Sequence, residues 1–271
     1  MTKIIVTGTE GFIGKNFLKS LDKDFVVVKI NEDIFSNPNW TDSLKEILGD
    51  TKPSAIFHFG ACSDTLETDV NYMMTRNYEF TKILSDYCFL HNTKIVYSSS
   101  AANYGTNGIY PSNLYGWSKY AAEQYVIQNG GIALRYFNVY GPGEEHKGRM
   151  ASVAYQMWQK YKTGEEVKLF PGKPKRDFVF VDDVVSANLE AYNNYDEYHF
   201  HWFEVGSGEA KTFEDVLDVF EIPYDYTDES LIPIGYQMFT QSDKEKWMSG
   251  WRPKYDLKNG LLKYKEYLDV I

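Results

Sequence analysis

Cysteine and positive charge are both scarce in this chain of 271 residues. Its two cysteines, Cys62 and Cys88, are too few for a disulfide framework, so we expect a reducing compartment. Lysine and arginine number 28 against 38 acidic residues, which gives a formal net charge of −10. A protein of this charge offers no basic stripe for a phosphate backbone, so we expect no nucleic-acid partner.

Long hydrophobic runs are also lacking. No uncharged apolar stretch approaches the roughly 20 residues that span a bilayer, so we expect no membrane partner. The first residues show no charged segment followed by an apolar core, so we expect no secretory signal. Hydrophobic residues make up 43% and charged residues 24% of the chain, which is typical of a globular enzyme. We therefore predict a cytoplasmic protein with one large α/β unit and a smaller lobe.

Three glycines follow the first apolar run of the chain. The run over residues 3–7 is typical of a buried parallel strand, and a helix is predicted over residues 15–21. Between them, Gly8 permits a tight turn, Gly11 lets backbone amides approach a pyrophosphate, and Gly14 lets the helix pack on the strand. This spacing at a strand-to-helix turn indicates dinucleotide binding, and a glycine-rich turn without a ligand is the alternative.

The second predicted strand, residues 25–29, bears on the choice of cofactor. It ends at Lys29, where such folds commonly place an acid that binds the ribose 2′-hydroxyl. A cation at this position tolerates a 2′-phosphate, so the sequence favours NADP over NAD. Glu32 and Asp33 follow closely, which keeps NAD open.

Predicted strands and helices alternate as far as about residue 140, which indicates a Rossmann-like, doubly wound parallel sheet. We assign residues 1–140 and 178–205 to an NADP-binding domain, and residues 141–177 and 206–271 to a substrate-binding lobe. The other strands are expected at residues 53–59, 94–98, 131–137, 177–181 and 203–205. The other helices are expected at residues 41–49, 72–90, 149–162, 183–192, 211–220 and 257–268, and one begins near residue 115.

Tyr115 and Lys119 stand four residues apart in a predicted helix, so they share one face. A phenol with a pKa near ~10 is a poor base at neutral pH, and a nearby ammonium lowers that pKa. Ser100 ends the preceding strand, where open α/β sheets place their sites. These residues predict proton transfer at a carbinol oxygen. Because the chain has 22 tyrosines, a chance pair on a solvated helix face is the alternative.

In order and spacing, the glycine triad, Ser100, Tyr115 and Lys119 resemble the extended short-chain dehydrogenase/reductase family of nucleotide-sugar enzymes. Further stretches resemble its ADP-heptose 6-epimerase branch, and these are Phe-His-Phe-Gly-Ala-Cys-Ser over 57–63, His-Lys-Gly over 146–148, Met-Ala-Ser-Val-Ala over 150–154, and residues 72–74, 135–142, 176–179 and 236–241. The resemblance implies an isomerase of lipopolysaccharide precursor synthesis. A hydride would leave C6 of an ADP-heptose for bound NADP and return to the opposite face.

The resemblance also implies roles for particular residues. Ser100 would bind the substrate oxygen, Tyr115 would transfer the proton, and Lys119 would also hold the nicotinamide ribose. Inversion needs a second acid/base, which would be Lys147, although a surface-loop lysine is the alternative. The full cofactor-binding set, including the glycine turn and Lys29, is Gly8, Gly11, Phe12, Ile13, Gly14, Lys29, Asp33, Ile34, Phe59, Gly60, Ala61, Asn77, Ser98, Lys119 and Val139.

The residues expected beside the nucleotide sugar lie mostly in the second half of the chain. Arg176 suits a diphosphate because a guanidinium binds it bidentately, and a solvated loop charge is the alternative. Arg149 and Gln156 replace a serine and a histidine of the branch, which leaves the exact sugar open. The whole expected set is Ser100, Asn138, Arg149, Gln156, Phe170, Pro171, Gly172, Lys173, Arg176 and Tyr236. We predict no metal site.

Two other hypotheses remain open at this point. A 4-epimerase, reductase or 4,6-dehydratase of another nucleotide sugar is the alternative within the class. A dehydratase usually carries an Asp-Glu pair where Ala101 and Ala102 stand here. A catalytically silent nucleotide-binding protein is the alternative from another class. We also expect a homo-oligomer that associates through long helices, with residues 72–90 and 119–128 as candidates.

Overall fold

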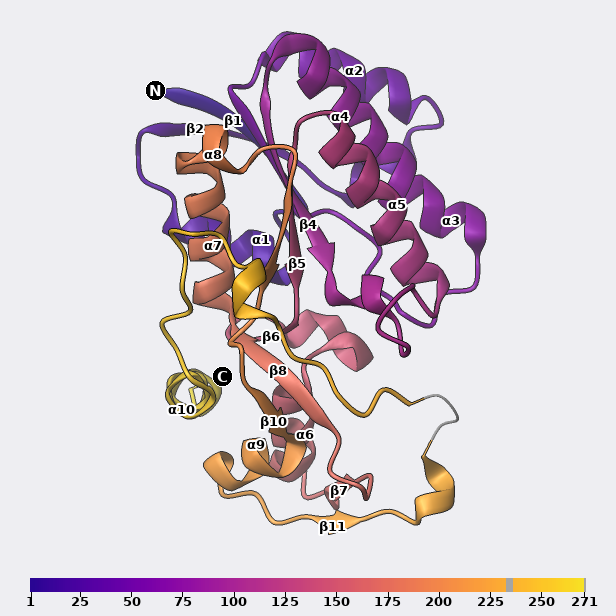
Figure 1. Ribbon diagram of the computed structural model, residues 1–271, viewed down its shortest axis with the longest axis vertical. Helices are drawn as coiled ribbons and strands as arrows, with labels where there is room; N and C mark the ends of the chain where they lie inside the picture. The colour runs from indigo at the N-terminus through magenta and orange to yellow at the C-terminus, as the bar shows by residue number, and fades with distance from the viewer. Residues whose placement is uncertain (233–235, 271) are drawn as a thin grey trace. The chain divides into compact units, whose positions relative to one another are not determined.

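The computed structural model describes residues 1–232 and 236–270, which belong to two compact units (Figure 1). The first unit comprises Met1–Arg135 and Val185–Phe203, and the second comprises Tyr136–Val184 and Glu204–Ile271. The division into a cofactor-binding domain and a substrate-binding lobe is a statement about ligands and stays a prediction.

A six-stranded sheet in the order β2-β1-β3-β4-β5-β9 organises the first unit. The pairs β1–β2, β1–β3 and β3–β4 are parallel, and the fold is the predicted α/β, Rossmann-like one. Every residue of β3 is buried, as expected of a strand covered on both faces. The strands are β1 (Thr2–Thr7), β2 (Phe25–Ile30), β3 (Ala55–His58), β4 (Lys94–Ser100), β5 (Ile132–Tyr136) and β9 (Trp202–Val205).

Helices cover both faces of this sheet (Figure 1). Leu48 and Leu84 pack with Ile56 of β3 in one core cluster, and this face carries α2, α4 and α5. On the other face the ring of Phe17 in α1 lies 4.4 Å from that of Phe57. The helices of the unit are α1 (Phe12–Ser20), α2 (Trp40–Thr51), α3 (Val70–Met74), α4 (Phe80–His91), α5 (Leu114–Gln128), most of α7 (Val181–Asn193), α8 (Tyr195–Tyr198), and the 3-10 turns η1 (Glu32–Ser36) and η3 (Ala101–Tyr104).

The helix predicted over residues 72–90 contains one irregular turn. A π-helical turn, η2 (Thr75–Glu79), joins α3 to α4, and such turns accommodate one extra residue. Asn77 in this turn is fully buried. Its amide donates to the Cys62 carbonyl at 3.0 Å and to Ser118 Oγ at 2.9 Å, and its oxygen accepts the Cys62 N–H at 2.7 Å. The turn therefore ties α4 to α5 and to the segment after β3.

The second unit is built on a three-stranded sheet in the order β10-β8-β6. Its central strand β8 (Lys175–Phe180) is parallel to β6 (Asn138–Tyr140) and antiparallel to β10 (Ala210–Thr212). The sequence placed the strand over residues 177–181 among the last pieces of the large sheet, which is wrong. Alternation of strand and helix gives no signal for a second sheet, because that sheet forms from strands far apart in the chain.

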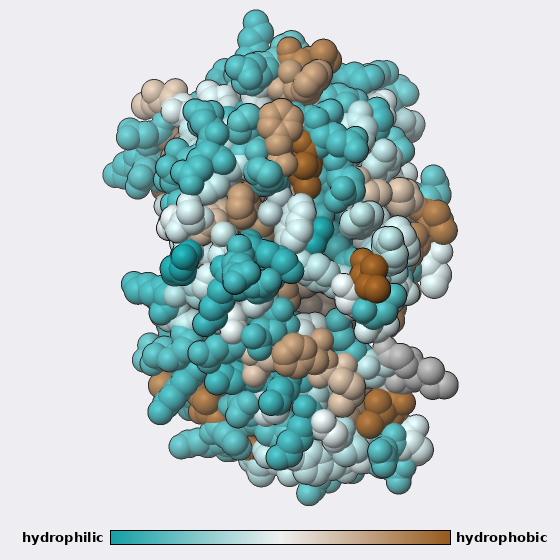
Figure 2. All heavy atoms as spheres, viewed as in Figure 1, coloured by the Kyte–Doolittle hydropathy of each residue, from teal (hydrophilic) through white to brown (hydrophobic). Residues whose placement is uncertain are grey.

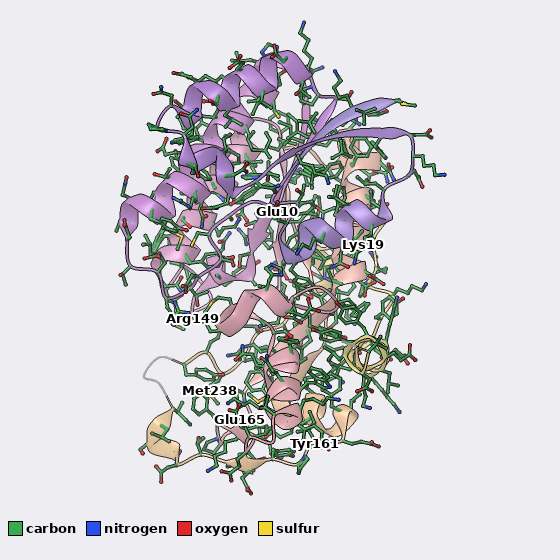
Figure 3. All side chains as sticks on the ribbon, turned by 180° about the vertical axis from the view of Figure 1, so that it is seen from behind. Glu10, Lys19, Arg149, Tyr161, Glu165 and Met238 are labelled. Atoms are coloured by element: carbon green, nitrogen blue, oxygen red, sulfur yellow. The ribbon has the colours of Figure 1, made fainter. Side chains whose placement is uncertain are left out.

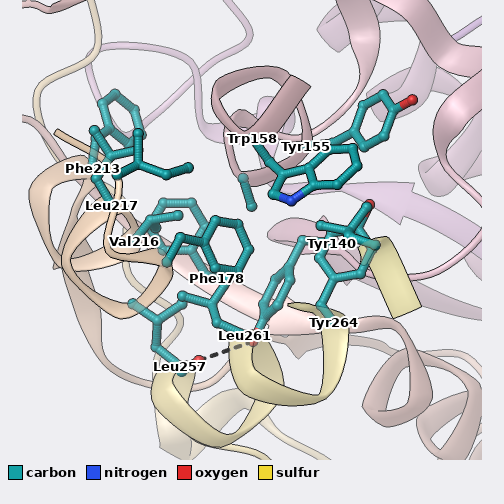
Figure 4. Packing of buried hydrophobic residues seen from close by; sticks show 14 of the residues in the cluster. Tyr140, Tyr155, Trp158, Phe178, Phe213, Val216, Leu217, Leu257, Leu261 and Tyr264 are labelled. Carbon is teal, nitrogen blue, oxygen red and sulfur yellow. Dashed lines mark hydrogen bonds between the residues drawn. The ribbon is translucent and has the colours of Figure 1, made fainter. Parts of the chain in front are cut away.

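Three helices pack around β8 and close the core of the second unit, and these are α6 (Val153–Lys162), α9 (Phe213–Phe220) and α10 (Leu257–Leu268). Figure 4 shows Trp158, Phe178, Leu217 and Leu261 in this core, with the Tyr140 hydroxyl donating to the Leu257 carbonyl at 3.4 Å. The remaining short elements are β7 (Lys168–Leu169), β11 (Asp225–Tyr226), η4 (Glu145–Met150), η5 (Glu229–Leu231) and η6 (Lys244–Lys246).

The helix predicted over residues 149–162 begins later than expected. Ser152 caps it, because its hydroxyl accepts the N–H of Tyr155 at 3.2 Å. The preceding residues form the turn η4, in which Gly148 has a φ of 53°. A serine cap three residues inside the predicted helix explains the difference.

Hydrophilic residues predominate on the face shown in Figure 2, with hydrophobic ones scattered among them. Within residues 1–232 and 236–270, no helix is both long enough and apolar enough to traverse a lipid bilayer.

Candidate active site

The glycine turn forms a cradle that only glycine permits at two positions. Gly8 has a φ of +65°, and a Cβ there would lie 2.7 Å from the Cα of Gly60 at the end of β3. A Cβ on Gly14 would lie 2.1 Å from the carbonyl oxygen of Gly8. The turn and the first helical residues of α1 therefore approach each other as closely as backbones can. A cradle of this kind fits a dinucleotide pyrophosphate at the helix N-terminus.

A cavity of about 190 Å³ opens beside this cradle in the first unit. Five predicted residues line it, and these are Gly8, Gly11, Phe59, Gly60 and Ala61. Glu32, which keeps NAD open in the sequence, also lines the cavity. The remaining lining residues were not predicted, and these are Thr7, Glu10, Ile30, Asn31, Phe35, Arg76 and Phe80. Figure 3 labels Glu10 and Lys19 at the two ends of α1.

Lys29 is absent from the residues that line the cavity and has an exposed side chain. Successive side chains of a strand point to opposite faces, and the next residue, Ile30, is buried and lines the cavity. Lys29 therefore points away. The other predicted cofactor residues outside the lining are Phe12, Ile13, Gly14, Asp33, Ile34, Asn77, Ser98, Lys119 and Val139.

Ser100 and Tyr115 are brought together at the carboxyl end of β4. Ser100 is the last residue of the strand, and its hydroxyl also accepts the N–H of Ala102 at 3.1 Å. Tyr115 lies in the first turn of α5, which Asn113 caps by accepting the N–H of Gly116 at 2.8 Å. Burial raises the pKa of the Tyr115 phenol, and its hydrogen bond with Ser100 acts in the opposite direction.

Lys119 is one turn beyond Tyr115 and only 3% exposed. Burial lowers the pKa of Lys119 to about 7, while the Glu123 carboxylate acts to raise it. Its Nζ lies 4.3 Å from the ring centroid of Tyr97. Burial is the largest influence on the pKa of both groups, and the prediction that Lys119 lowers the pKa of Tyr115 stays a prediction.

A buried ion pair that the sequence did not reveal supports these residues. The Glu123 carboxylate receives two hydrogen bonds from Arg135, at 2.8 and 2.5 Å. It also accepts from Ser99 Oγ at 2.6 Å and from the Asn103 amide at 2.9 Å. Glu123 thus connects α5 with the end of β4 and with η3, on either side of Ser100. Glu123 stands four residues after Lys119, and this spacing was the one sequence feature that could have indicated its role. The same spacing is equally typical of a charge on an exposed helix face.

In the second unit, Lys147 lies in η4 and is partly buried. Burial lowers its pKa, and the Glu144 carboxylate acts to raise it. Glu144 is fully buried and accepts hydrogen bonds from Ser152 Oγ at 2.7 Å and from the Tyr264 hydroxyl at 3.0 Å. It also accepts the backbone N–H groups of Ser152 and Gly141. Glu144 therefore fixes the turn that carries Lys147, and burial disfavours the hypothesis of an ordinary surface lysine.

Arg149 and Gln156, the two residues that depart from the family pattern, lie close together. The amide of Gln156 donates to the carbonyl of Ala151 at 2.7 Å and to that of Arg149 at 3.3 Å. Gln156 therefore holds the end of η4 from the first turns of α6. The side chain of Arg149 is exposed and is labelled in Figure 3.

Arg176 lies in β8 and is 8% exposed, which contradicts the alternative of a solvated loop charge. Its only hydrogen bond within the described ranges runs from Nη1 to the Lys175 carbonyl at 2.9 Å. The guanidinium carbon lies 5.3 Å from the ring centroid of Tyr236, which in turn stacks edge-on against Phe170 at 5.3 Å. Burial lowers the pKa of Arg176. A buried cation between aromatic rings, with no carboxylate partner in the described part of the chain, suits an anionic ligand.

A carboxylate beside Arg176 holds the segment that carries Tyr236. Asp177 accepts hydrogen bonds from the backbone and hydroxyl of both Ser207 and Ser242, and from the N–H of Gly208, at 2.6–2.9 Å. The same segment runs beside β8, where the Lys175 N–H donates to the Met238 carbonyl at 2.8 Å. The remaining predicted residues are Asn138, exposed on β6, and the turn of Pro171, Gly172 and Lys173 before β8.

The glycine cradle at the end of β1, with Ser100, Tyr115 and Lys119 at the end of β4 and in α5, defines a dinucleotide-binding protein of the short-chain dehydrogenase/reductase class. The chain belongs to the NAD dependent epimerase/dehydratase family, whose pattern it matches over residues 4–206. It is 36% identical over 312 residues to the ADP-L-glycero-D-manno-heptose-6-epimerase of Brachyspira hyodysenteriae, with 98% of each chain covered.

Solved structures of related enzymes share the whole fold. The ADP-L-glycero-D-manno-heptose-6-epimerase of Helicobacter pylori superimposes with a TM-score of 0.85 and 25% identity, over 100% of this chain and 97% of that one. The UDP-glucose 4-epimerase of Thermotoga maritima, solved with UDP-glucose, gives a TM-score of 0.85 and 25% identity over 99% of each chain. By sequence and by fold, the chain thus belongs with the NAD-dependent epimerases and dehydratases.

Proposed function

We propose that this protein inverts C6 of an ADP-heptose by transient oxidation with bound NADP. The observation that carries the proposal is the 36% identity, over nearly the full length of both chains, to an ADP-L-glycero-D-manno-heptose-6-epimerase. The buried Arg176 supports it further, because an ADP-sugar offers a diphosphate to an otherwise uncompensated guanidinium.

The bound dinucleotide would supply the hydride acceptor for oxidation and the hydride donor for reduction. Ser100 would hold the reacting oxygen through its hydroxyl, which already forms a hydrogen bond with Tyr115. A raised pKa keeps the Tyr115 phenol protonated at neutral pH, so Tyr115 retains a proton to donate to the alkoxide in the step in which the alcohol is restored. Lys147 would be the second acid/base, because burial lowers its pKa toward the working range of such a group.

A single substitution tests the role of Lys147. Replacing Lys147 by Met should lower the epimerisation rate by about 100-fold or more, because positioned proton transfer contributes on that scale. Cofactor affinity should stay as in the wild type. Lys258→Met, which removes an exposed lysine in α10, is the matched control and should leave both quantities unchanged. Full epimerase activity in Lys147→Met would contradict the assignment.

The reaction itself is tested by proton NMR of the purified protein with ADP-D-glycero-D-manno-heptose. Conversion to the L-glycero epimer without added dinucleotide is the expected result, since the hydride is returned in each cycle. If the protein carries a dinucleotide and leaves this sugar unchanged, the ADP-heptose proposal is wrong.

The second candidate is 4-epimerisation of another nucleotide sugar, because the UDP-glucose 4-epimerase structure matches this chain as well as the heptose enzyme does. Adding UDP-glucose, GDP-sugars and dTDP-sugars to the same NMR experiment distinguishes 4-epimerisation from 6-epimerisation of an ADP-heptose.

The proposed function also includes self-association through α4 and α5. Sedimentation velocity tests it, and a monomer as the only species would contradict it.

A further inference from the structure

The cofactor cavity contains a cation that neither the glycine turn nor the second strand supplies. Arg76, from the π-helical turn η2, lines the cavity and is 19% exposed. Its Nε donates to the Glu32 carboxylate at 2.5 Å. Glu32 follows the end of β2 and lines the same cavity. In dinucleotide folds this is where an acid accepts the ribose 2′-hydroxyl, so the partner of Glu32 lies within reach of the 2′ position.

The position of Arg76 does not depend on Glu32 alone. Its guanidinium carbon lies 3.6 Å from the ring centroid of Tyr72 and 4.8 Å from that of Phe35. Stacking on two rings fixes a planar guanidinium even where its ion pair is lost. Glu32 is 62% exposed, so it can turn into solvent at little cost. The cation is therefore preorganised and the anion is the movable member.

The number of unused hydrogen-bond donors on Arg76 also indicates that it can bind an anionic ligand. A guanidinium has five N–H donors, and within residues 1–232 and 236–270 only the Nε–H of Arg76 makes a hydrogen bond. Both terminal nitrogens stay available beside the cavity. Two parallel N–H groups match two oxygens of a phosphate. A ribose hydroxyl has one oxygen and does not require such a pair of donors.

Building on the dinucleotide site of the proposed function, we propose that Arg76 selects the cofactor by binding a ribose 2′-phosphate, and that Glu32 opposes it. With NAD, Glu32 accepts the ribose hydroxyl and keeps its ion pair with Arg76. With NADP, Glu32 turns outward and Arg76 takes the phosphate. NADP binding therefore depends on Arg76, and the exposed Lys29 makes no contribution.

The test is direct titration of purified, cofactor-stripped protein with NAD⁺ and with NADP⁺, without any sugar. Arg76→Gln should weaken NADP⁺ binding by about tenfold or more, as expected for losing a charged pair near 4 Å in a partly exposed site, and should change NAD⁺ binding by less than about threefold. Arg76→Lys should restore most of the NADP⁺ affinity. Glu32→Gln should favour NADP⁺ over NAD⁺ by severalfold.

Two further substitutions sharpen this experiment. Lys29→Gln tests the residue that the sequence favoured, and Lys19→Gln removes a charge at the far end of α1. Both should leave the ratio of the two affinities unchanged. The inference is overturned if Arg76→Gln leaves that ratio unchanged, or if Lys29→Gln is the variant that loses NADP⁺. Failure of the wild-type protein to bind either dinucleotide would overturn the proposed function itself, and the two failures are thus distinguishable.

Discussion

Replacing Lys119 by Met should make the stability of the cofactor-stripped protein less dependent on pH. The pKa of Lys119 is about 7 in the folded chain, against an ordinary value of 10.5. At pH 6 the amine is protonated in both the folded and the unfolded chain, so the cost of burying its charge is fully present. Above pH 7 the folded chain releases the proton while the unfolded chain keeps it, so stability rises with pH. At about 1.4 kcal/mol per pH unit, the gain between pH 6 and pH 9 is roughly 3 kcal/mol.

Urea unfolding of the wild type and of Lys119→Met at pH 6, 7, 8 and 9 measures this effect. The variant should be the more stable protein at pH 6, and its advantage should shrink by roughly 3 kcal/mol by pH 9. Lys147 also has a lowered pKa, but it remains in both proteins and cancels in the difference. Lys29→Met serves as the control because that side chain is exposed. A stability difference that stays constant with pH would refute the burial of a titrating amine.

Two buried carboxylates lead to predictions about stability that urea unfolding also measures. Glu123→Gln should cost about 3–5 kcal/mol, because it leaves the guanidinium of Arg135 buried without its charge partner; a loss below about 1 kcal/mol would show that the pair is hydrated. Asp177→Ala should cost about 3 kcal/mol or more, because Ser207, Gly208 and Ser242 lose their common acceptor. Unchanged unfolding of that variant would mean that water replaces the carboxylate.

Much of the fold could be predicted because its signals are local. β1, β3 and β4 are apolar and β-branched, and α10 matches its predicted bounds of 257–268 because an aspartate cap and an apolar stripe mark it. The second sheet could not be predicted, because β10 and β6 find β8 only through long-range pairing. Helix boundaries were also hard to predict, since the cap at Ser152 makes α6 begin four residues later than expected.

The site residues, too, were predicted where the signal is local and missed where it depends on the tertiary fold. Gly8, Gly60 and Ser100 were predicted because the backbone at strand ends dictates where they lie. Arg76 and Glu123 were missed, since each is one of many charges on a helix and only the tertiary fold shows which are buried or face a cavity. Lys29 was chosen by counting residues from the first glycine, and a shift of one residue along a strand moves a side chain to the other face.

The π-helical turn η2 also limits how this chain tolerates changes in length. One residue in a regular helix corresponds to a rotation of about 100° and a rise of about 1.5 Å. Deleting one residue within 75–79 would let α3 and α4 merge into an ordinary helix, and would change the directions in which the remaining residues of the turn point. Asn77 would then leave Cys62 and Ser118, and Arg76 would leave the cavity. A substitution at Asn77 or at Arg76 removes the contacts of that residue alone. A deletion of one codon in this turn would remove the contacts of both residues at once.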